Sequence, residues 1–281
     1  MPVITMTQEM ATLGKDVALG VCEALGLAQV RHEIGDVVAG RMQVKKSLIR
    51  RLREGKASTM ERWTADEKTI SIFTAEEVFD LAVKGNVLIR GWGATLWLRQ
   101  VSHIPAIQVC APMSLRVTRL MGRLETSDEN LARKEIRTDD AARAARMHEH
   151  FDVEWGDPSL YDLTLNTERI PVPICVDMVV ALTRNAAFAE TTASRQQLLD
   201  LALAAHVRAA LRSNTDTSHV DVAIAADGGV VTLSGIVSNP REHDHCGEVA
   251  SAVAGVTRVD NQLGAMTGGL GGRIFPGGLT R

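Results

Sequence analysis

Short apolar segments alternate with longer helical patterns through the first two thirds of the chain. Four of these segments have the length of a buried strand, at residues 2–6, 86–90, 106–111 and 161–166. Apolar residues recur at helical spacing in the stretches between and after them, at residues 14–25, 34–84, 125–151 and 174–183 and after Pro112. Because strands that alternate with helices are typical of βαβ units, the pattern predicts an α/β domain over residues 1–185, with a parallel sheet flanked by helices.

The pattern changes after this domain, and residues 186–195 are predicted to be a linker. A helix (196–211), two alternating runs (220–224 and 230–235), a second helix (242–254) and a last strand (256–263) follow. The two runs flank Asp227-Gly228-Gly229, a hairpin turn signal. The order predicts a small α+β domain (α-β-β-α-β) over residues 196–267. The glycine-rich residues 268–281 have no apolar period and are predicted to form a flexible tail.

Composition narrows the functional classes. A length of 281 residues with 45% hydrophobic residues fits two globular domains. The formal net charge of −3 gives no general positive field for a nucleic-acid backbone, so no DNA or RNA partner is expected. The first residues carry no basic signal region, and the four cysteines are scattered without a C-x-x-C pair. We therefore expect a cytoplasmic protein with reduced thiols.

The candidate chemistry begins at the strand, loop and helix of residues 3–25. A helix N-terminus favours anions, and the P-loop pattern G-x-x-x-x-G-K-[ST] uses it to bind phosphates. Gly14-Lys15 occupies the right place here, while Glu9 stands at the first glycine position and Asp16 at the hydroxyl position. The segment predicts a phosphate loop that uses Leu13, Gly14, Lys15 and Asp16; the alternative is an ordinary helix cap.

Further segments resemble the cytidylate-kinase-like family, in the correct order along the chain. The first match is to the opening motif I-S-R-E-F-G-S-G-G-[RK]-x-[IV]-A, which is similar to Thr5-Met6-Thr7-Gln8-Glu9 with Gly14-Lys15-Asp16-Val17-Ala18. The second match is to a strand that ends in G-R-G-A, which is similar to the segment ending in Arg90-Gly91-Trp92-Gly93-Ala94. Cys110-Ala111-Pro112 with Arg116 and Arg119 resembles A-P-x-x-x-R-x-x-R, and Asp140-Ala141-Ala142-Arg143 resembles the D-x-x-R of a lid helix. Trp155-Gly156-Asp157-Pro158 with Tyr161-Asp162-Leu163-Thr164-Leu165-Asn166-Thr167 resembles W-G-D-P-x-x-Y-D-L-x-[LI]-N-T.

This resemblance implies a P-loop kinase fold and transfer of the ATP γ-phosphoryl group to a nucleoside monophosphate, such as a cytidylate, with Mg²⁺. It implies catalytic roles for Lys15, Arg137 and Arg143, and ATP contacts from residues 13–16 together with Arg116 and Arg119. Substrate contacts are expected from Arg41, Arg90, Trp92 and Asp140. The metal would be held with the nucleotide, with Asp16 as a possible ligand. For each arginine the alternative is a solvated helix face.

The sequence departs from the family pattern at the loop and beside the substrate. Ala11 and Leu13 replace glycines, and Trp92 replaces the arginine of G-R-G-A. A Cβ in the loop can block the approach of the backbone to phosphate. The alternative function is therefore a degenerate kinase domain that senses a nucleotide or acts as a scaffold.

Residues 196–266 resemble a BON domain. The segments Asp227-Gly228-Gly229-Val230-Val231-Thr232-Leu233-Ser234-Gly235-Ile236-Val237 and Val253-Ala254-Gly255-Val256-Thr257-Arg258-Val259-Asp260-Asn261-Gln262-Leu263 resemble D-G-x-V-x-L-x-G-x-V and V-x-G-V-x-x-V-x-N-x-L. We expect Val231, Leu233 and Ile236 to form a buried face. The resemblance implies a protein partner, homo-oligomerisation or a phospholipid surface as the target of this domain, and an adaptor on such a surface is a further alternative.

Two polar clusters remain. His243-Asp244-His245-Cys246 contains possible zinc ligands, but no second ligand pair is near in the sequence, so we interpret it as a polar helix start. The basic run Lys45-Lys46-Ser47-Leu48-Ile49-Arg50-Arg51-Leu52-Arg53 fits contact with nucleotide phosphates or a partner, and we favour a solvated face.

Overall fold

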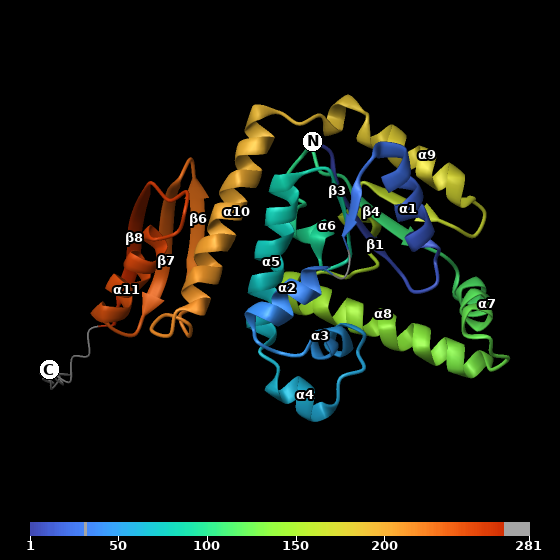
Figure 1. The fold of residues 1–281 in the computed structure, drawn as a ribbon, viewed down its shortest axis with the longest axis horizontal. Helices are drawn as coiled ribbons and strands as arrows, with labels where there is room; N and C mark the ends of the chain where they lie inside the picture. The colour runs from blue at the N-terminus through green and yellow to red at the C-terminus, as the bar shows by residue number, and fades with distance from the viewer. Residues whose placement is uncertain (31–32, 267–281) are drawn as a thin grey trace, which may run out of the picture. The chain divides into compact units, whose positions relative to one another are not determined.

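A computed structural model describes residues 1–30 and 33–266 (Figure 1). The predicted tail at residues 268–281 lies outside the described residues. The chain divides into two compact units, Met1–Ala205 and His206–Arg281, and each is described by itself. The division falls inside a helix, whereas the sequence predicts the boundary at residues 186–195.

The first unit is built on a five-stranded sheet. Its strands are β1 (Val3–Gln8), β2 (Ala28–Val30), β3 (Val87–Arg90), β4 (Ala106–Cys110) and β5 (Leu163–Asn166). They are arranged in the order β2-β3-β1-β4-β5, and every pairing is parallel, which confirms the predicted class of fold. The sequence missed β2, because three residues at a sheet edge give no usable alternation.

Helices connect the strands and cover both faces of the sheet. They are α1 (Gly14–Leu25), α2 (Glu33–Arg41), α3 (Lys46–Arg53), α4 (Thr59–Thr64), α5 (Glu67–Lys84), α6 (Ala94–Trp97), α7 (Met113–Leu124), α8 (Glu129–Phe151) and α9 (Val172–Thr183), with short 3₁₀ turns at Pro158–Leu160 and Ala186–Phe188. The stretch predicted as helical over residues 34–84 is four separate helices. Ser58 forms a capping box with Glu61 and Asp66 caps α5, so the chain starts a new helix at each.

The core of this unit lies on both sides of β1. Ile4 and Met6 of β1 are fully buried, and α1 packs against α9 on one face, while α5 and α6 contact the sheet on the other (Figure 1). A satellite cluster joins α7 to α8 through Val117, Leu120 and Ile136. Met10 and Ala11 of the loop after β1 pack against this cluster, which fixes the loop beside α8.

The second unit begins within α10 (Thr192–Ser213) and continues through β6 (Ala223–Asp227), β7 (Val230–Val237), α11 (Pro240–Ser251) and β8 (Arg258–Ala265). The strand order is β6-β7-β8, with an antiparallel hairpin and a parallel pair, as the α-β-β-α-β pattern predicts. Gly228 and Gly229 both have positive φ, which the hairpin turn requires.

One expectation for this unit is wrong. Val231 and Leu233 are fully buried, but Ile236 is 71% exposed. Residues of a strand alternate between its faces, so the buried set of β7 continues at Val237 and Ile236 falls on the other face.

The cysteines are free, as their scattered spacing in the sequence predicts. All four cysteines are free thiols, and Cys22, Cys175 and Cys246 are buried. Within residues 1–30 and 33–266, no helix has both the length and the apolar character that a bilayer crossing requires.

Candidate functional site

The loop after β1 contains two left-handed residues, a feature of anion-binding nests, and it is called the nest below. Ala11 and Leu13 both have φ of 62°, and the intervening Thr12 separates them before α1 begins at Gly14. Alternation of left-handed with right-handed residues turns successive N–H groups toward one point, where they can bind an anion. Left-handed backbone costs a residue with a Cβ roughly 1–2 kcal/mol, so this shape is maintained against local strain.

The amides of this nest have no partner. Between Ala11 and Lys15, no backbone N–H group donates a hydrogen bond to a described residue. The two flanking amides are used: Met10 donates to Asp140 Oδ1 at 3.2 Å, and Asp16 donates to Leu13 O at 2.9 Å. Five consecutive unpaired donors at a helix N-terminus are suited to the oxygens of a polyphosphate.

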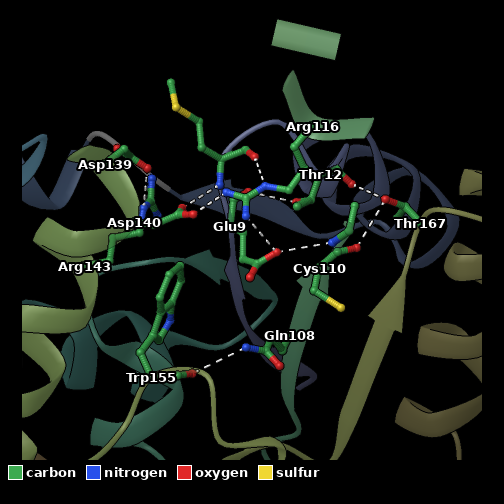
Figure 2. Close-up of polar contacts among 12 residues, drawn as sticks. Glu9, Thr12, Gln108, Cys110, Arg116, Asp139, Asp140, Arg143, Trp155 and Thr167 are labelled. Atoms are coloured by element: carbon green, nitrogen blue, oxygen red, sulfur yellow. Dashed lines mark hydrogen bonds and ion pairs between the residues drawn. The ribbon is translucent and has the colours of Figure 1, made fainter. Parts of the chain in front are cut away.

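A buried arginine holds the loop in this shape. Arg116 of α7 is 3% exposed, and its Nε donates to Met10 O at 2.7 Å. The same guanidinium forms ion pairs with Glu9 and with Asp140 of α8, as Figure 2 shows. Burial raises the pKa of Glu9, although the charge of Arg116 opposes that shift. Arg116 therefore ties together the loop, α7 and α8.

A second set of contacts fixes the loop from the other side. Thr167 Oγ1 donates to Thr12 O at 2.7 Å, while Arg119 donates to Thr167 Oγ1 at 3.0 Å and to Thr167 O at 2.8 Å. Thr12 is itself fully buried, and its hydroxyl donates to Glu9 O at 2.9 Å. The guanidinium groups of Arg116 and Arg119 are thus both bound to protein.

The charged side chains at the start of α1 face solvent. Lys15 and Asp16 are exposed and lie in the first turn, directly after the unpaired amides. An exposed ammonium beside a nest fits the β- and γ-phosphates of ATP, and one carboxylate together with phosphate oxygens fits Mg²⁺. Among the described residues, there is no cluster of three or more His, Cys, Asp or Glu that could hold a metal by itself.

Beside the loop lies a cavity of about 470 Å³, here called the cationic cavity. It lies at the carboxyl ends of β1 and β3, where ligands of open α/β sheets bind. Its described lining holds six cations and three carboxylates: Lys46, Arg50, Arg53, Arg90, Arg143 and Arg146, with Asp36, Glu54 and Asp139. Gln8, the last residue of β1, also lines it and accepts a 3.0 Å hydrogen bond from Arg90.

The positive charge of this cavity is only partly neutralised. Lys46 pairs with Asp36 at 2.7 Å and Arg143 with Asp139 at 2.7 Å. Arg50 makes no ion pair within the part of the chain that the structure describes. Burial, and then the charge of Arg143, lowers the pKa of the Arg146 guanidinium to about 10, so it remains charged at neutral pH, and the carboxylates of Asp139, Glu67 and Glu149 partly offset this shift. The cavity is therefore suited to a ligand with two or more negative charges.

Two models of known protein families match parts of this chain. Residues 3–169, more than half of the chain, match the model of the cytidylate kinase-like family. The chain belongs to the cytidylate kinase-like family. Residues 200–264 match the BON domain.

Individual relatives of this cytidylate kinase-like protein are distant. A cytidylate kinase of Staphylothermus marinus is 32% identical over 110 residues, which is 38% of this chain and 60% of that protein. The chain thus spans about 60% of the length of this curated relative. An uncharacterized protein from Eubacterium ventriosum superposes with a TM-score of 0.51 at 17% identity, covering 65% of this chain and 98% of the other, which shows the fold alone. A shikimate kinase from Bacteroides thetaiotaomicron reaches a TM-score of only 0.41 at 12% identity, covering 66% of this chain and 99% of the other.

The residues that the sequence singled out fall into four places. Arg90, Trp92 and Arg143 line the cationic cavity. Residues 13–16, with Arg116, Arg119 and Asp140, form or support the loop. Arg41 pairs with Glu76 and stacks on Phe73 at 4.1 Å, and Arg137 lines a separate open groove. The roles assigned to these residues stay predictions.

Sequence reasoning missed Arg146 of α8 and the cations that α3 brings to the cavity. The basic run was interpreted as a solvated face, yet Lys46, Arg50 and Arg53 line the cavity while Ile49 is buried at 2% exposure. Their spacing of four and three residues places them on one helix face, and that is the signal that could have found them. Arg53 also stacks over the indole of Trp92, 3.3 Å from the ring centroid.

Proposed function

We propose that the first unit is a nucleoside monophosphate kinase, which transfers the γ-phosphoryl group of ATP to a nucleotide acceptor. The observation that carries this proposal is the adjacency of two anion sites at one edge of the sheet. Gln8 lines the cationic cavity, and the nest of unpaired amides follows it in the chain. One site suits the polyphosphate of the donor and the other the phosphate of the acceptor.

The residues have separable tasks in this proposal. The amides of residues 11–15 and Lys15 hold the donor phosphates, and Asp16 supplies a carboxylate toward Mg²⁺, which would neutralise phosphate charge when bound. Arg50 and Arg146 hold the acceptor phosphate. Arg143, which lies on α8 beside Trp155 and is oriented by Asp139 (Figure 2), lines the cationic cavity and stabilises the charge of the transferring group. Arg116 and Arg119 position the loop.

The experiment is a transfer assay on the full chain. With γ-labelled ATP, Mg²⁺ and a panel of nucleoside monophosphates, the proposal predicts labelled nucleoside diphosphate and ADP in equal amounts. Lys15→Met should reduce turnover at least a hundredfold, in line with the loss of one charge-stabilising contact. Lys84→Met is the matched control, because Lys84 is exposed in the last turn of α5, before β3 begins. Full turnover by Lys15→Met would refute the assignment of the donor site.

A catalytically inactive nucleotide sensor is the second candidate, and the two residues with a Cβ in the loop favour it. Ala11 and Leu13 hold the nest in a strained left-handed backbone. A loop that binds a nucleotide without transferring its phosphoryl group requires a less close approach of the backbone to the phosphates. Binding of ATP and a monophosphate without any transfer, under conditions where both sites are saturated, would select this candidate. The role of the BON domain, toward a protein partner, a second copy or phospholipid, stays a prediction.

A further inference from the structure

A second, smaller cavity of about 80 Å³ adjoins the cationic cavity, and it is called here the aromatic cavity. Five residues line both: Arg53, Gly91, Trp92, Arg143 and Arg146. The remaining wall is mostly aromatic, with Trp97, Phe151 and Trp155 beside the Trp92 indole. Such a cavity suits a planar ring that stacks on aromatic faces. A ring joined to an anion in the cationic cavity would lie here.

The polar groups of the aromatic cavity are mainly hydrogen-bond donors. The indole N–H of Trp97 donates only, and no described residue accepts from it. The three guanidinium groups that line the cavity also donate only. By contrast, the Trp155 Nε1 donor is already bound to Thr7 Oγ1 at 3.0 Å. Among the described lining residues there is no carboxylate.

Two nearly buried hydroxyls add groups that can donate or accept. Thr74 is 6% exposed and Thr95 is 3% exposed, and both line the cavity without a hydrogen bond from either hydroxyl within the described chain. Two of the local backbone carbonyls are used internally. Gly91 O accepts from Ala94 N at 3.1 Å, and Gly93 O accepts from Leu96 N and Trp97 N at 2.8 and 2.9 Å. The two hydroxyls can therefore pair with either kind of ligand group, and the donor-only groups, led by the Trp97 N–H, favour an oxygen acceptor on the ligand.

The carboxylates of the neighbouring cavity do not change this balance. Asp36 is paired with Lys46, Asp139 with Arg143, and Glu54 lies 3.8 Å from Lys56. Burial lowers the pKa of His150, so its imidazole is neutral near pH 7 and can offer one acceptor at most. An exocyclic amine on the ring would have few acceptors to bind, whereas a carbonyl would have several donors.

The size of the aromatic cavity limits the ring. A cavity of roughly 150 Å³ holds benzene, so a volume of about 80 Å³ encloses less than one full ring and favours a single ring over a fused purine. The rest of the ring would extend into the cationic cavity, where Arg53 stacks over the Trp92 indole.

We infer that the acceptor is a pyrimidine nucleoside monophosphate with a carbonyl-rich base, of the uracil class, and that the Trp97 N–H selects it over a cytosine base. This inference rests on the proposed function, because it uses the cationic cavity as the acceptor-phosphate site. It narrows that function away from the base that the family name indicates.

The test is calorimetric titration of the full chain with UMP, dTMP, CMP, AMP and GMP. UMP should bind about fivefold or more tightly than CMP, because a mispaired buried group loses at least that much affinity, and the purine nucleotides should bind more weakly still. Trp97→Phe keeps the ring that packs edge-on against Phe151 at 4.7 Å and removes only the N–H. It should weaken UMP about two- to tenfold while CMP changes less than twofold. Trp63→Phe, at an indole that is 91% exposed, is the control and should change neither.

A reverse variant gives an independent readout. Ser71→Asp places an acceptor-only group in the lining and should shift the UMP-to-CMP affinity ratio toward CMP by about tenfold. CMP binding as tight as UMP in the wild type, with Trp97→Phe affecting both alike, would overturn the inference and leave the kinase proposal standing. If no monophosphate binds at all, the acceptor site fails and both proposals fall together.

Discussion

Arg116 provides the strongest test of how the loop keeps its shape. The guanidinium is 3% exposed and bridges Met10 O, Glu9 and Asp140. Arg116→Met keeps the length of the side chain and leaves the two carboxylates without a cation. Removing one partner of a buried ion pair costs about 3–5 kcal/mol. Because the side chains of Glu9 and Asp140 are 28% and 20% exposed, water screens part of the loss, and we expect the lower end, about 3 kcal/mol.

The assay is thermal unfolding of the full chain followed by tryptophan fluorescence. All four tryptophans (Trp63, Trp92, Trp97 and Trp155) lie in the first unit, so the signal reports this unit alone. A loss of about 3 kcal/mol corresponds to a fall in Tm of roughly 6–12 °C for a unit of this size. Arg123→Met, at an exposed position on the same helix, is the control and should lower Tm by less than about 2 °C.

The pH dependence of the loss checks its cause. Burial raises the pKa of Glu9 above its ordinary 4.5, and the charge of Arg116, followed by the hydrogen bond from Ala111 N, opposes this shift. Without Arg116 the pKa rises further, so the charged form is penalised more at neutral pH, and protonation relieves the penalty as the pH falls toward about 4.5. The difference in Tm between the wild type and Arg116→Met should thus become smaller as the pH falls. A fall in Tm under 2 °C, or an equal fall at pH 8 and pH 4.5, would refute the reasoning.

Three further predictions test the loop, the cavity and a buried histidine. Leu13→Gly relieves left-handed strain of about 1 kcal/mol but raises the conformational entropy of the unfolded chain by a similar free energy, so the free energy of unfolding should change by less than about 1 kcal/mol. The affinity for ADP should not fall. A tenfold loss of affinity would contradict phosphate binding by the nest. Arg50→Met should weaken binding of the preferred monophosphate about five- to tenfold and reduce its salt dependence, whereas Lys45→Met, outside the cavity lining, should not. Burial lowers the pKa of His103, whose Nδ1 lies 2.8 Å from Ser194 Oγ, so on acidification the unfolded chain binds a proton before the folded chain does. The free energy of unfolding in urea should therefore fall from pH 7.5 to pH 5.5, and His103→Gln should reduce this fall. An unchanged fall in the variant would exclude His103 as its source.

The sequence was sufficient for the parts of the fold that depend on local pattern. The buried strands β1, β3 and β4 follow from short apolar runs, and Asp227-Gly228-Gly229 predicts the hairpin of the second unit because that turn needs positive φ. The edge strand β2 and the breaks between α2 and α5 were not predictable at this level. They depend on pairing with β3 and on caps at Ser58 and Asp66, whose effect appears only when the helices pack.

The candidate site shows a similar limit. The P-loop pattern predicted Lys15 and the family resemblance predicted Arg90 as phosphate contacts. Lys15 lies in the first turn of α1 after the unpaired amides, and Arg90, the last residue of β3, lines the cavity, while their roles stay predictions. Burial cannot be obtained from spacing, so the sequence could not tell that Arg116 is bound to Met10 and two carboxylates. Nor could it tell that α3 turns Arg50 and Arg53 toward the cavity, since that depends on where Ile49 packs.

The central claim is that the amides of residues 11–15 accept a polyphosphate. The most direct measurement is the change in backbone amide NMR signals of the full chain when a non-hydrolysable ATP analogue and Mg²⁺ are added. The account predicts that the signals of residues 11–15 shift most, since their N–H groups gain acceptors that the protein does not supply, and that Lys15→Met weakens the titration. Saturable binding of the analogue that leaves the signals of residues 11–15 unchanged would contradict it.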